Sequence, residues 1–186
     1  MKILTIHADF IEFETKKKAL KEAEEVKEGK KRVEECLVVF TAVEKRDEEN
    51  IAEVTRRYIQ EIEDVARQVK TETIVLYPYA HLSSSLAKPK KAEELIKEAE
   101  KILLADKEKY KVIRAPFGWY KSFNISCKGH PLSELSREFS AGEEEKKKET
   151  ARREGKGYDV KEEKEKEKEE IIDTERIIDT ESLLKK

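Results

Sequence analysis

The chain has 186 residues, of which 44% are charged and 37% hydrophobic, and its formal net charge is −2. This length suits one domain with a core of its own, or one domain and a tail. The near-neutral charge excludes a broad basic surface for non-specific nucleic-acid binding, so we expect any contact with nucleic acid to be local.

The first part of the chain has the pattern of strands. Residues 2–7 and 10–15 are rich in β-branched or alternating apolar residues, which predicts two short strands joined by a tight turn. Residues 16–34 are rich in Lys and Glu and have few apolar positions, so we expect an exposed helix or an irregular segment. The run "ECLVVFTAVE" at 35–44 is the most apolar stretch and predicts a central strand.

Helical and strand patterns alternate in the middle of the chain. Apolar residues recur at helical spacing over 50–70, and Asn50 stands where a helix N-cap is expected. A strand is predicted over 73–79, followed by a loop over 80–89. A second amphipathic helix is predicted over 90–106.

Strand patterns return before residue 140. We predict strands over 110–116 and 118–128, and a loop that enters a short helical turn over 130–139. Strands that alternate with helices and are flanked by hairpin-like pairs are typical of an α/β domain with a mixed sheet.

The composition changes near residue 140, which predicts two parts. Residues 1–140 form the folded domain, and 141–186 form a charged linker or tail. Most residues in 143–170 are charged, and no apolar face exists there. Such a segment is typical of a solvated helix or a disordered region.

The reactive residue types offer few signs of a cofactor site. His7, His81 and His130 each stand at or just after a predicted strand, but no closely spaced ligand pair of a zinc site is present. P-loop, GxGxxG and GxSxG motifs are also missing. We therefore expect no metal and no nucleotide cofactor, and we expect Cys36 and Cys127 to be packing thiols.

The stretch "APFGWYKSFNISCKGHPLSE" (115–134) gathers rare residues in a highly charged chain. Strand alternation places Trp119 and Lys121 on one side and Tyr120 on the other. A lysine in such a strand either extends its charged end to solvent or points into a pocket. The residues alone leave both readings open.

This stretch and "LYPYAHLSSSLAKP" (76–89) closely resemble the N-terminal editing domain of archaeal threonyl-tRNA synthetases, and the opening "MKILTIHADFIEFE" fits it too. The resemblance covers residues 1 to about 140. It implies a three-layer α/β/β fold like that of D-aminoacyl-tRNA deacylases, in a homodimer. It also implies proofreading: hydrolysis of L-seryl-tRNA(Thr) at the 3′ end, with release of serine and free tRNA.

The resemblance also implies which residues form the site and what each does. Lys121 positions the attacking water or stabilises charge on the ester oxygens, while His81 and Glu134 bind the serine hydroxyl, its amine or a water. The 2′-hydroxyl of the terminal adenosine assists, and no cofactor is needed. The implied catalytic residues are His81, Tyr120, Lys121 and Glu134, and the implied binding residues are Val43, Pro78, Ala80 and Phe117.

The sequence and the resemblance also suggest partners, a cellular compartment and two alternative functions. We expect a synthetase catalytic domain to act with this chain, in cis or in trans. No apolar run is long enough for a membrane helix and the start has no signal-peptide pattern, so we expect a cytoplasmic protein without membrane contact. One alternative is a D-aminoacyl-tRNA deacylase with the same fold. Another is a non-catalytic module for tRNA binding or assembly.

Overall fold

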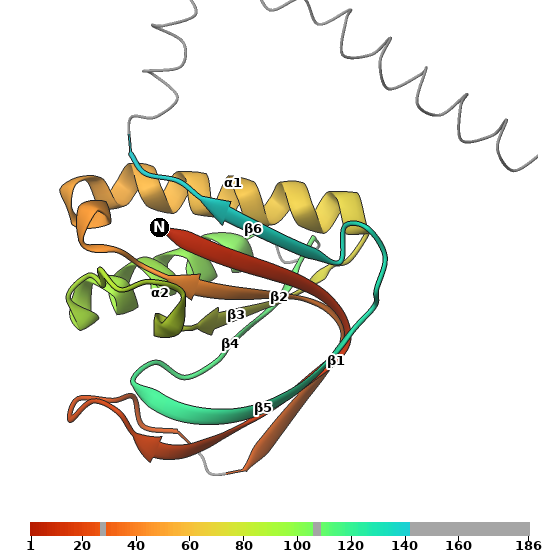
Figure 1. Cartoon of the computed structure of the whole chain (residues 1–186), viewed down its shortest axis with the longest axis horizontal. Coiled ribbons are helices and arrows are strands. Elements are labelled where there is room, and N and C mark those ends of the chain that lie inside the picture. Colours follow the sequence, from red (N-terminus) through yellow and green to blue (C-terminus); the bar gives the residue numbers. More distant parts are fainter. Residues whose placement is uncertain (27–28, 106–108, 142–186) are drawn as a thin grey trace, which may run out of the picture. The chain divides into compact units, whose positions relative to one another are not determined.

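The computed structural model describes residues 1–26, 29–105 and 109–141, which contain one mixed sheet and two long helices (Figure 1). The helices are α1 (Ile51–Val69) and α2 (Pro89–Ala105). The strands are β1 (Lys2–Lys18), β2 (Lys30–Ala42), β3 (Thr73–Pro78), β4 (Lys111–Arg114), β5 (Trp119–Cys127) and β6 (Glu134–Glu138).

The strand order in the sheet is β4-β3-β2-β1-β5, and β6 also pairs with β1. The pairs β2–β3 and β3–β4 are parallel, whereas β1 is antiparallel to its three neighbours. Strand β6 covers the first part of β1 and β5 covers the rest, so β1 has strand partners on both edges along most of its length. The predicted mixed α/β sheet is therefore confirmed.

Two apolar cores lie on opposite faces of this sheet. Alternate residues of the central strands, such as Leu37 and Leu76, pack against both helices in the first core. Their neighbours Val38 and Tyr77 belong to a second core on the other face, which includes Phe13 of β1. The side-chain alternation of the buried strands thus supplies both cores at once.

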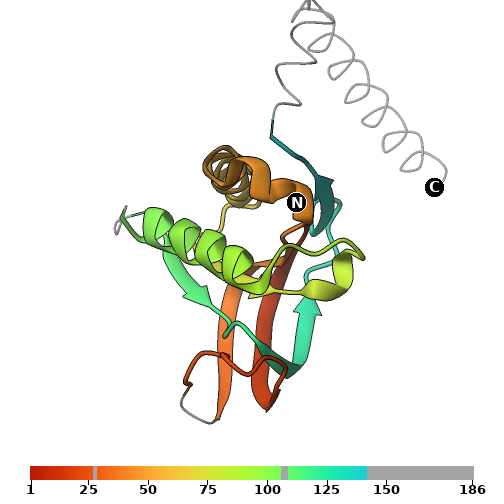
Figure 2. The ribbon, with the colours of Figure 1, turned by 90° about the vertical axis from the view of Figure 1, so that its left-hand side faces the viewer.

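The long strands fold over the second core (Figures 1 and 2). Phe123 of β5 lies with its ring centre 5.7 Å from that of Tyr77 of β3, although β1 and β2 separate these strands in the sheet. Strands in a flat sheet are about 4.8 Å apart, so rings three strands apart would not meet. The curvature gives three layers: the helices, the β2–β3–β4 part and the part that carries β1 and β5.

Helix α1 confirms the helical prediction over 50–70. The side chain of Asn50 accepts a hydrogen bond from the backbone N–H of Glu53, as the predicted N-cap. The helix ends where Lys70 adopts the left-handed conformation, with φ 56°.

Two predictions at the start of the chain need correction. Residues 2–7 and 10–15 are not two strands, because β1 runs through both without a turn and pairs with β2 along this length. The irregularity near Asp9 is a shift in the register with β5, which a strand accommodates as a bulge. The predicted helix or irregular segment over 16–34 belongs at its two ends to β1 and β2, and the described residues between these strands, 19–26 and 29, form no helix.

The helical turn predicted within 130–139 is also wrong, because Glu134–Glu138 form strand β6. Its five residues pair with Lys2–Ile6 of β1. Such a short polar segment carries little local pattern, and its partner strand is more than a hundred residues away in the chain.

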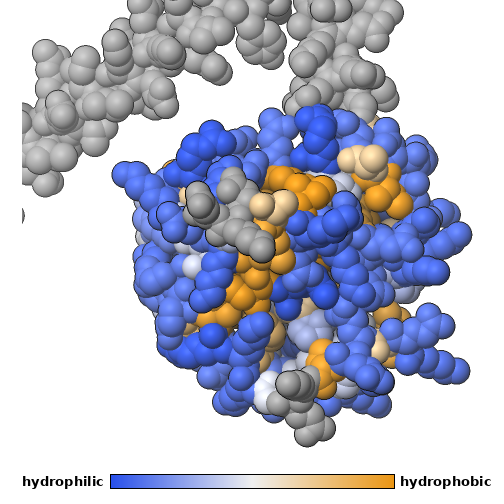
Figure 3. All heavy atoms as spheres, turned by 180° about the vertical axis from the view of Figure 1, so that it is seen from behind, coloured by the Kyte–Doolittle hydropathy of each residue, from blue (hydrophilic) through white to orange (hydrophobic). Residues whose placement is uncertain are grey.

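The predicted charged tail lies outside the described residues, apart from its first residue, Ala141. Among the helices that the structure describes, none combines the length and apolar character needed to cross a bilayer. The face opposite to the view of Figure 1 is largely hydrophilic, with a band of apolar side chains across it (Figure 3).

Candidate active site

A cavity of about 420 Å³ lies at the carboxyl end of β3. The ends of β2 and β3 form one wall, the start of β5 forms another, and residues of α2 contribute an apolar side. Carboxyl ends of parallel strands are where α/β folds hold ligands. The volume suits a small molecule or the end of a larger one.

Seven of the eight predicted site residues line this cavity, although they come from three separate parts of the chain. They are Val43, Pro78, Ala80, His81, Phe117, Tyr120 and Lys121. Glu134 does not line it. Its exposed carboxylate accepts a hydrogen bond from Cys127 Sγ at 3.4 Å, on β6.

Lys121 presents a half-buried amine to the cavity. Its Nζ donates hydrogen bonds to the backbone carbonyl oxygens of Pro116, at 2.9 Å, and Trp119, at 3.1 Å. Burial lowers the pKa of this amine to about 8, because the charged form loses hydration, while the charge of Glu24 opposes the shift. A perturbed amine in a cavity marks a candidate for chemistry.

His81 reaches the cavity from a short 3-10 helix, Ala80–Leu82, that directly follows β3. The backbone N–H of Tyr79 donates to the carbonyl oxygen of Thr41 at 2.8 Å, which ties the start of this turn to β2. The His81 ring lies 5.3 Å from the Tyr79 ring, centre to centre, and is exposed. Its polar atoms are therefore accessible to a ligand.

Aromatic rings form a surface beneath Lys121 that the sequence did not reveal as part of the site. Lys121 Nζ lies 5.1 Å from the centre of the Tyr77 ring, within cation–π range. Tyr77 in turn contacts the rings of Phe40 and Phe123. Sequence analysis did not name Tyr77 as a site residue, because its contact with Lys121 joins β3 to β5.

Glu24 holds the segment after β1 against the cavity, and sequence analysis missed it. Its carboxylate accepts hydrogen bonds from Arg114 Nη1 at 2.7 Å and from the backbone N–H of Phe117 at 2.9 Å, and it pairs with Lys97. Burial alone would raise the pKa of this carboxyl, but Arg114 and the other donors outweigh it and lower the pKa to about 2. The indole of Trp119 donates to the Glu24 carbonyl oxygen at 2.8 Å.

Gly118 completes this contact between the two segments. Its carbonyl oxygen accepts hydrogen bonds from the N–H groups of Ala19 and Leu20, both of which line the cavity. Gly118 has φ +77°, and a Cβ there would stand 3.0 Å from the Cβ of Ala23. The glycine in "GWYK" is thus required both by its backbone conformation and by the close approach.

The described residues contain no group of three or more His, Cys, Asp or Glu side chains that could hold a metal ion. His7 and His130 form a hydrogen bond of 2.7 Å between Nδ1 and Nε2. Burial lowers the pKa of His7, and the electrostatic interaction with His130 adds to this effect. The pair joins β1 to the loop before β6.

Residues 1–139 match the family described as the archaea-specific editing domain of threonyl-tRNA synthetase. The chain is 54% identical over 147 residues to a threonine–tRNA ligase of Methanocaldococcus jannaschii, which covers 78% of this chain and 23% of the relative. It is 51% identical over 151 residues to the threonine–tRNA ligase of Thermococcus sibiricus, and this match covers 80% of this chain and 24% of that relative. The chain therefore spans about a quarter of the length of these relatives.

A solved structure, named c-Myc DNA Unwinding Element Binding Protein, is similar with a TM-score of 0.51. The match covers 76% of this chain and all of that one, at 12% sequence identity. At this identity the likeness concerns the fold alone. It agrees with the predicted D-aminoacyl-tRNA deacylase-like arrangement of sheet and helices.

Proposed function

Because the chain belongs to the family of archaea-specific editing domains of threonyl-tRNA synthetase, we propose that its cavity hydrolyses mischarged L-seryl-tRNA(Thr). The products are serine and free tRNA. The observation that carries this proposal is the Lys121 amine, whose pKa is lowered to about 8 in a cavity that six other predicted site residues also line. The relatives themselves are named as threonine–tRNA ligases.

A separate site for hydrolysis has a clear physical purpose. Serine lacks one methyl group of threonine, and a binding pocket discriminates such a difference by only about 1–3 kcal/mol. A second cavity that accepts serine and rejects the larger threonine side chain adds a second selection, so that the discrimination factors of the two sites multiply. The apolar walls formed by Val43, Pro78 and Phe117 are suited to such exclusion by size.

The reaction is the addition of water across an ester. Water attacks the seryl carbonyl carbon, the bond from that carbon to the ribose oxygen breaks, and the ribose oxygen takes a proton. We assign to the Lys121 ammonium the stabilisation of negative charge on the ester oxygens, and to His81 and Tyr120 the positioning of the serine group or the water. The adenosine 2′-hydroxyl assists, so no cofactor is required.

The proposed partners follow from the same family. We propose that the 3′ end of tRNA(Thr) enters the cavity, that a synthetase catalytic domain acts in cis or in trans, and that the chain works in the cytoplasm as a homodimer. Glu134 supports the homodimer as part of this proposal, because its carboxylate is outside the cavity of its own chain. Its proposed catalytic role then needs a second copy to bring it there.

The test compares three substrates with the full chain at equal concentration: L-Ser-tRNA(Thr), L-Thr-tRNA(Thr) and a D-aminoacyl-tRNA. We expect release of serine at least tenfold faster than release of threonine. Equal turnover of serine and threonine, or of neither, contradicts the proposal. Cleavage of the D-aminoacyl ester alone identifies a chirality-proofreading enzyme, and a mobility shift of tRNA without ester cleavage identifies a binding module.

A further inference from the structure

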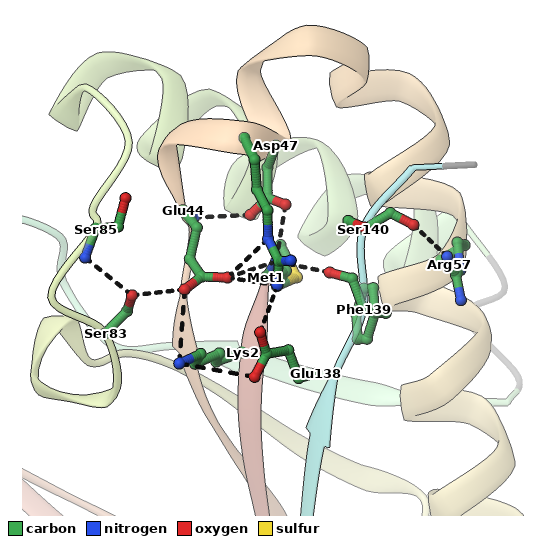
Figure 4. Close-up of polar contacts among 11 residues, drawn as sticks. Met1, Lys2, Glu44, Asp47, Arg57, Ser83, Ser85, Glu138, Phe139 and Ser140 are labelled. Carbon is green, nitrogen blue, oxygen red and sulfur yellow. Dashed lines mark hydrogen bonds and ion pairs between the residues drawn. The ribbon is translucent and has the colours of Figure 1, made fainter. Parts of the chain in front are cut away.

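The amino group of Met1 is completely buried in a cluster of acceptors (Figure 4). It donates to Asp47 Oδ1 at 2.8 Å, to Glu44 Oε2 at 3.2 Å and to the carbonyl oxygen of Phe139 at 2.7 Å. Asp47 is itself fully buried. Three acceptors around one buried ammonium group satisfy its hydrogen-bonding capacity, so its charge is compensated where it lies.

Glu44 connects this cluster to the cavity. Its second oxygen, Oε1, accepts a hydrogen bond of 2.6 Å from the hydroxyl of Ser83, which stands two residues after His81. Glu44 is also the residue that directly follows Val43, which lines the cavity. One buried carboxylate therefore contacts both the buried amino group and the segment that carries His81.

Backbone hydrogen bonds reinforce the same connection. The N–H of Ala87 donates to the carbonyl oxygen of Val43, and the N–H of Lys45 donates to that of Ser85, both at 3.0 Å. These bonds hold residues 85–87 beside 43–45. Ser83 is the point at which a side chain extends the attachment toward His81, and the Ser83 N–H donates to the carbonyl oxygen of Ala80 at 3.2 Å.

The electrostatics keep Glu44 ionised. Burial would raise the pKa of its carboxyl, but the Ser83 hydrogen bond and the Met1 ammonium outweigh burial and lower the pKa. Arg46 adds a second cation, at 3.0 Å from Oε2, and bridges to Glu138. A hydrogen bond from Ser83 to an ionised acceptor is stronger than one to a neutral acceptor.

We propose that Glu44, held in place by the Met1 ammonium, is a positioning residue that fixes the His81 segment at the cavity through Ser83. Glu44 does not line the cavity, and its effect on a ligand passes through residues 80–83. The functional half of this inference rests on the proposed hydrolysis. The positional half concerns the protein without substrate and is measured separately.

The central experiment replaces Ser83 with Ala in the full chain. Ser85→Ala is the matched control, since it removes the same hydroxyl two positions away, where the described contacts involve only backbone atoms of Ser85. We expect Ser83→Ala to speed hydrogen exchange of the Ala87 and Lys45 amides about tenfold, because a hydrogen bond to a charged group is lost. The His81 ring resonances should shift in NMR spectra of the same variant.

The activity arm uses L-Ser-tRNA(Thr). We expect Ser83→Ala to lower kcat about tenfold, because His81 is no longer held in position. KM should change less than about twofold, because the walls of the cavity that bind the ligand are unchanged. Ser83→Thr keeps the hydroxyl and should restore both exchange and kcat. Glu44→Gln should resemble Ser83→Ala, with a larger loss of thermal stability because the Met1 ammonium loses a charged partner.

The outcomes separate the two proposals. If the Ala87 and Lys45 amides exchange at the same rate in Ser83→Ala and Ser85→Ala, and the His81 ring resonances are the same in both variants, the positioning role is wrong. If exchange changes as expected but kcat of Ser83→Ala equals wild type, Glu44 has no role in catalysis and the inference also fails. If the wild-type chain itself cleaves no seryl-tRNA, the proposed function fails, while exchange and NMR still decide whether Glu44 positions the segment.

Discussion

The side-chain nitrogen of Lys121 lies 5.1 Å from the centre of the Tyr77 ring, and burial beside this surface lowers the pKa of the amine to about 8. The ordinary lysine value is 10.5. At neutral pH the protein thus maintains a poorly hydrated cation, which costs stability and is available to a substrate.

Replacing Lys121 with Met should abolish most hydrolysis and leave the fold more stable. We expect the rate of seryl-tRNA hydrolysis to fall at least about a hundredfold, as when an oxyanion-stabilising group is lost. We expect the free energy of unfolding at pH 7 to rise by about 1–2 kcal/mol, since the shift is discounted for the solvent that still reaches the side chain. Chemical denaturation and single-turnover kinetics measure the two effects.

Lys17→Met is the matched control for this variant. Lys17 is exposed and pairs with Tyr120 across β1 and β5. The variant therefore places a methionine close to Lys121 and leaves the buried amine unchanged. Its activity and stability should stay close to wild type. A Lys121→Met protein that hydrolyses seryl-tRNA at the wild-type rate would show that the amine only extends along the surface.

The pH dependence of the rate should report the same amine. The proposal requires the ammonium form, which is lost as pH rises through about 8. The ratio of wild-type to Lys121→Met rates should therefore be constant below about pH 7 and fall about tenfold for each unit well above pH 8. The ratio cancels the hydroxide-driven hydrolysis that both proteins share. A ratio that rises as pH increases through about 8 and then becomes constant would instead identify the neutral amine as a base.

Glu24 should make the fold sensitive to acid. Its pKa is lowered from 4.5 to about 2, so the folded state binds this proton more weakly than the unfolded state. The stabilisation is complete above about pH 4.5 and is lost as pH falls toward 2. Glu24→Gln should cost about 2 kcal/mol at pH 7 and flatten the acid limb of the stability curve.

The neighbouring Glu25 is the control, because it is exposed and stands next to Glu24 in the same segment. Glu25→Gln should leave the free energy of unfolding at pH 7 close to that of the wild type. Equal acid sensitivity of the wild type and Glu24→Gln would mean that Arg114 and Phe117 do not depend on this carboxylate.

Local patterns explain which parts of the fold were predictable. Helix α1 has a long apolar periodicity and an N-cap at Asn50, so its prediction needed only neighbouring residues. Strand β1 was predicted as two strands because Asp9 interrupts the alternation, but pairing with β2 on one side and with β5 and β6 on the other keeps the strand continuous. Pairing partners distant in the chain decided this case.

The residues of the candidate site also divide into those that sequence motifs indicated and those whose roles depend on distant contacts. Seven cavity residues were predicted because two long motifs resemble a known family, not because composition placed them together. Glu24 was missed because its role depends on Arg114 and Phe117, ninety or more residues away, and its own segment looks exposed. Nothing in the local sequence distinguishes it from the glutamates beside it.

Gly118 and Gly129 allow the cost of a backbone conformation to be separated from the cost of a clash. Both have positive φ, +77° and +74°, but only a Cβ at Gly118 would meet another atom, Ala23 Cβ at 3.0 Å. Each Ala variant should lose about 1 kcal/mol for the left-handed conformation. Gly118→Ala should lose a further 1–3 kcal/mol, as overpacking does, and should raise KM because Ala19 and Leu20 move.

Denaturation curves of the two variants measured side by side test this difference. Gly129→Ala serves as the control for the conformational cost, because nothing lies within 4 Å of its new Cβ. Equal stability of the two variants would mean that the segment around Ala23 gives way freely. In that case the close approach of Gly118 does not hold the cavity wall.

Glu134 tests whether two copies share a site. Its β-sheet partner is Ile6, and its carboxylate accepts a hydrogen bond from Cys127 Sγ and does not line the cavity of its own chain. If a second copy supplies Glu134, a heterodimer of Lys121→Met and Glu134→Gln chains contains one doubly altered site and one intact site. Mixing the two inactive proteins, with exchange of subunits verified by native mass spectrometry, should then restore up to about half of the wild-type activity per heterodimer. If both residues act within one chain, each site of the heterodimer is defective and mixing restores nothing. If Glu134→Gln alone is fully active, the carboxylate has no part in the reaction.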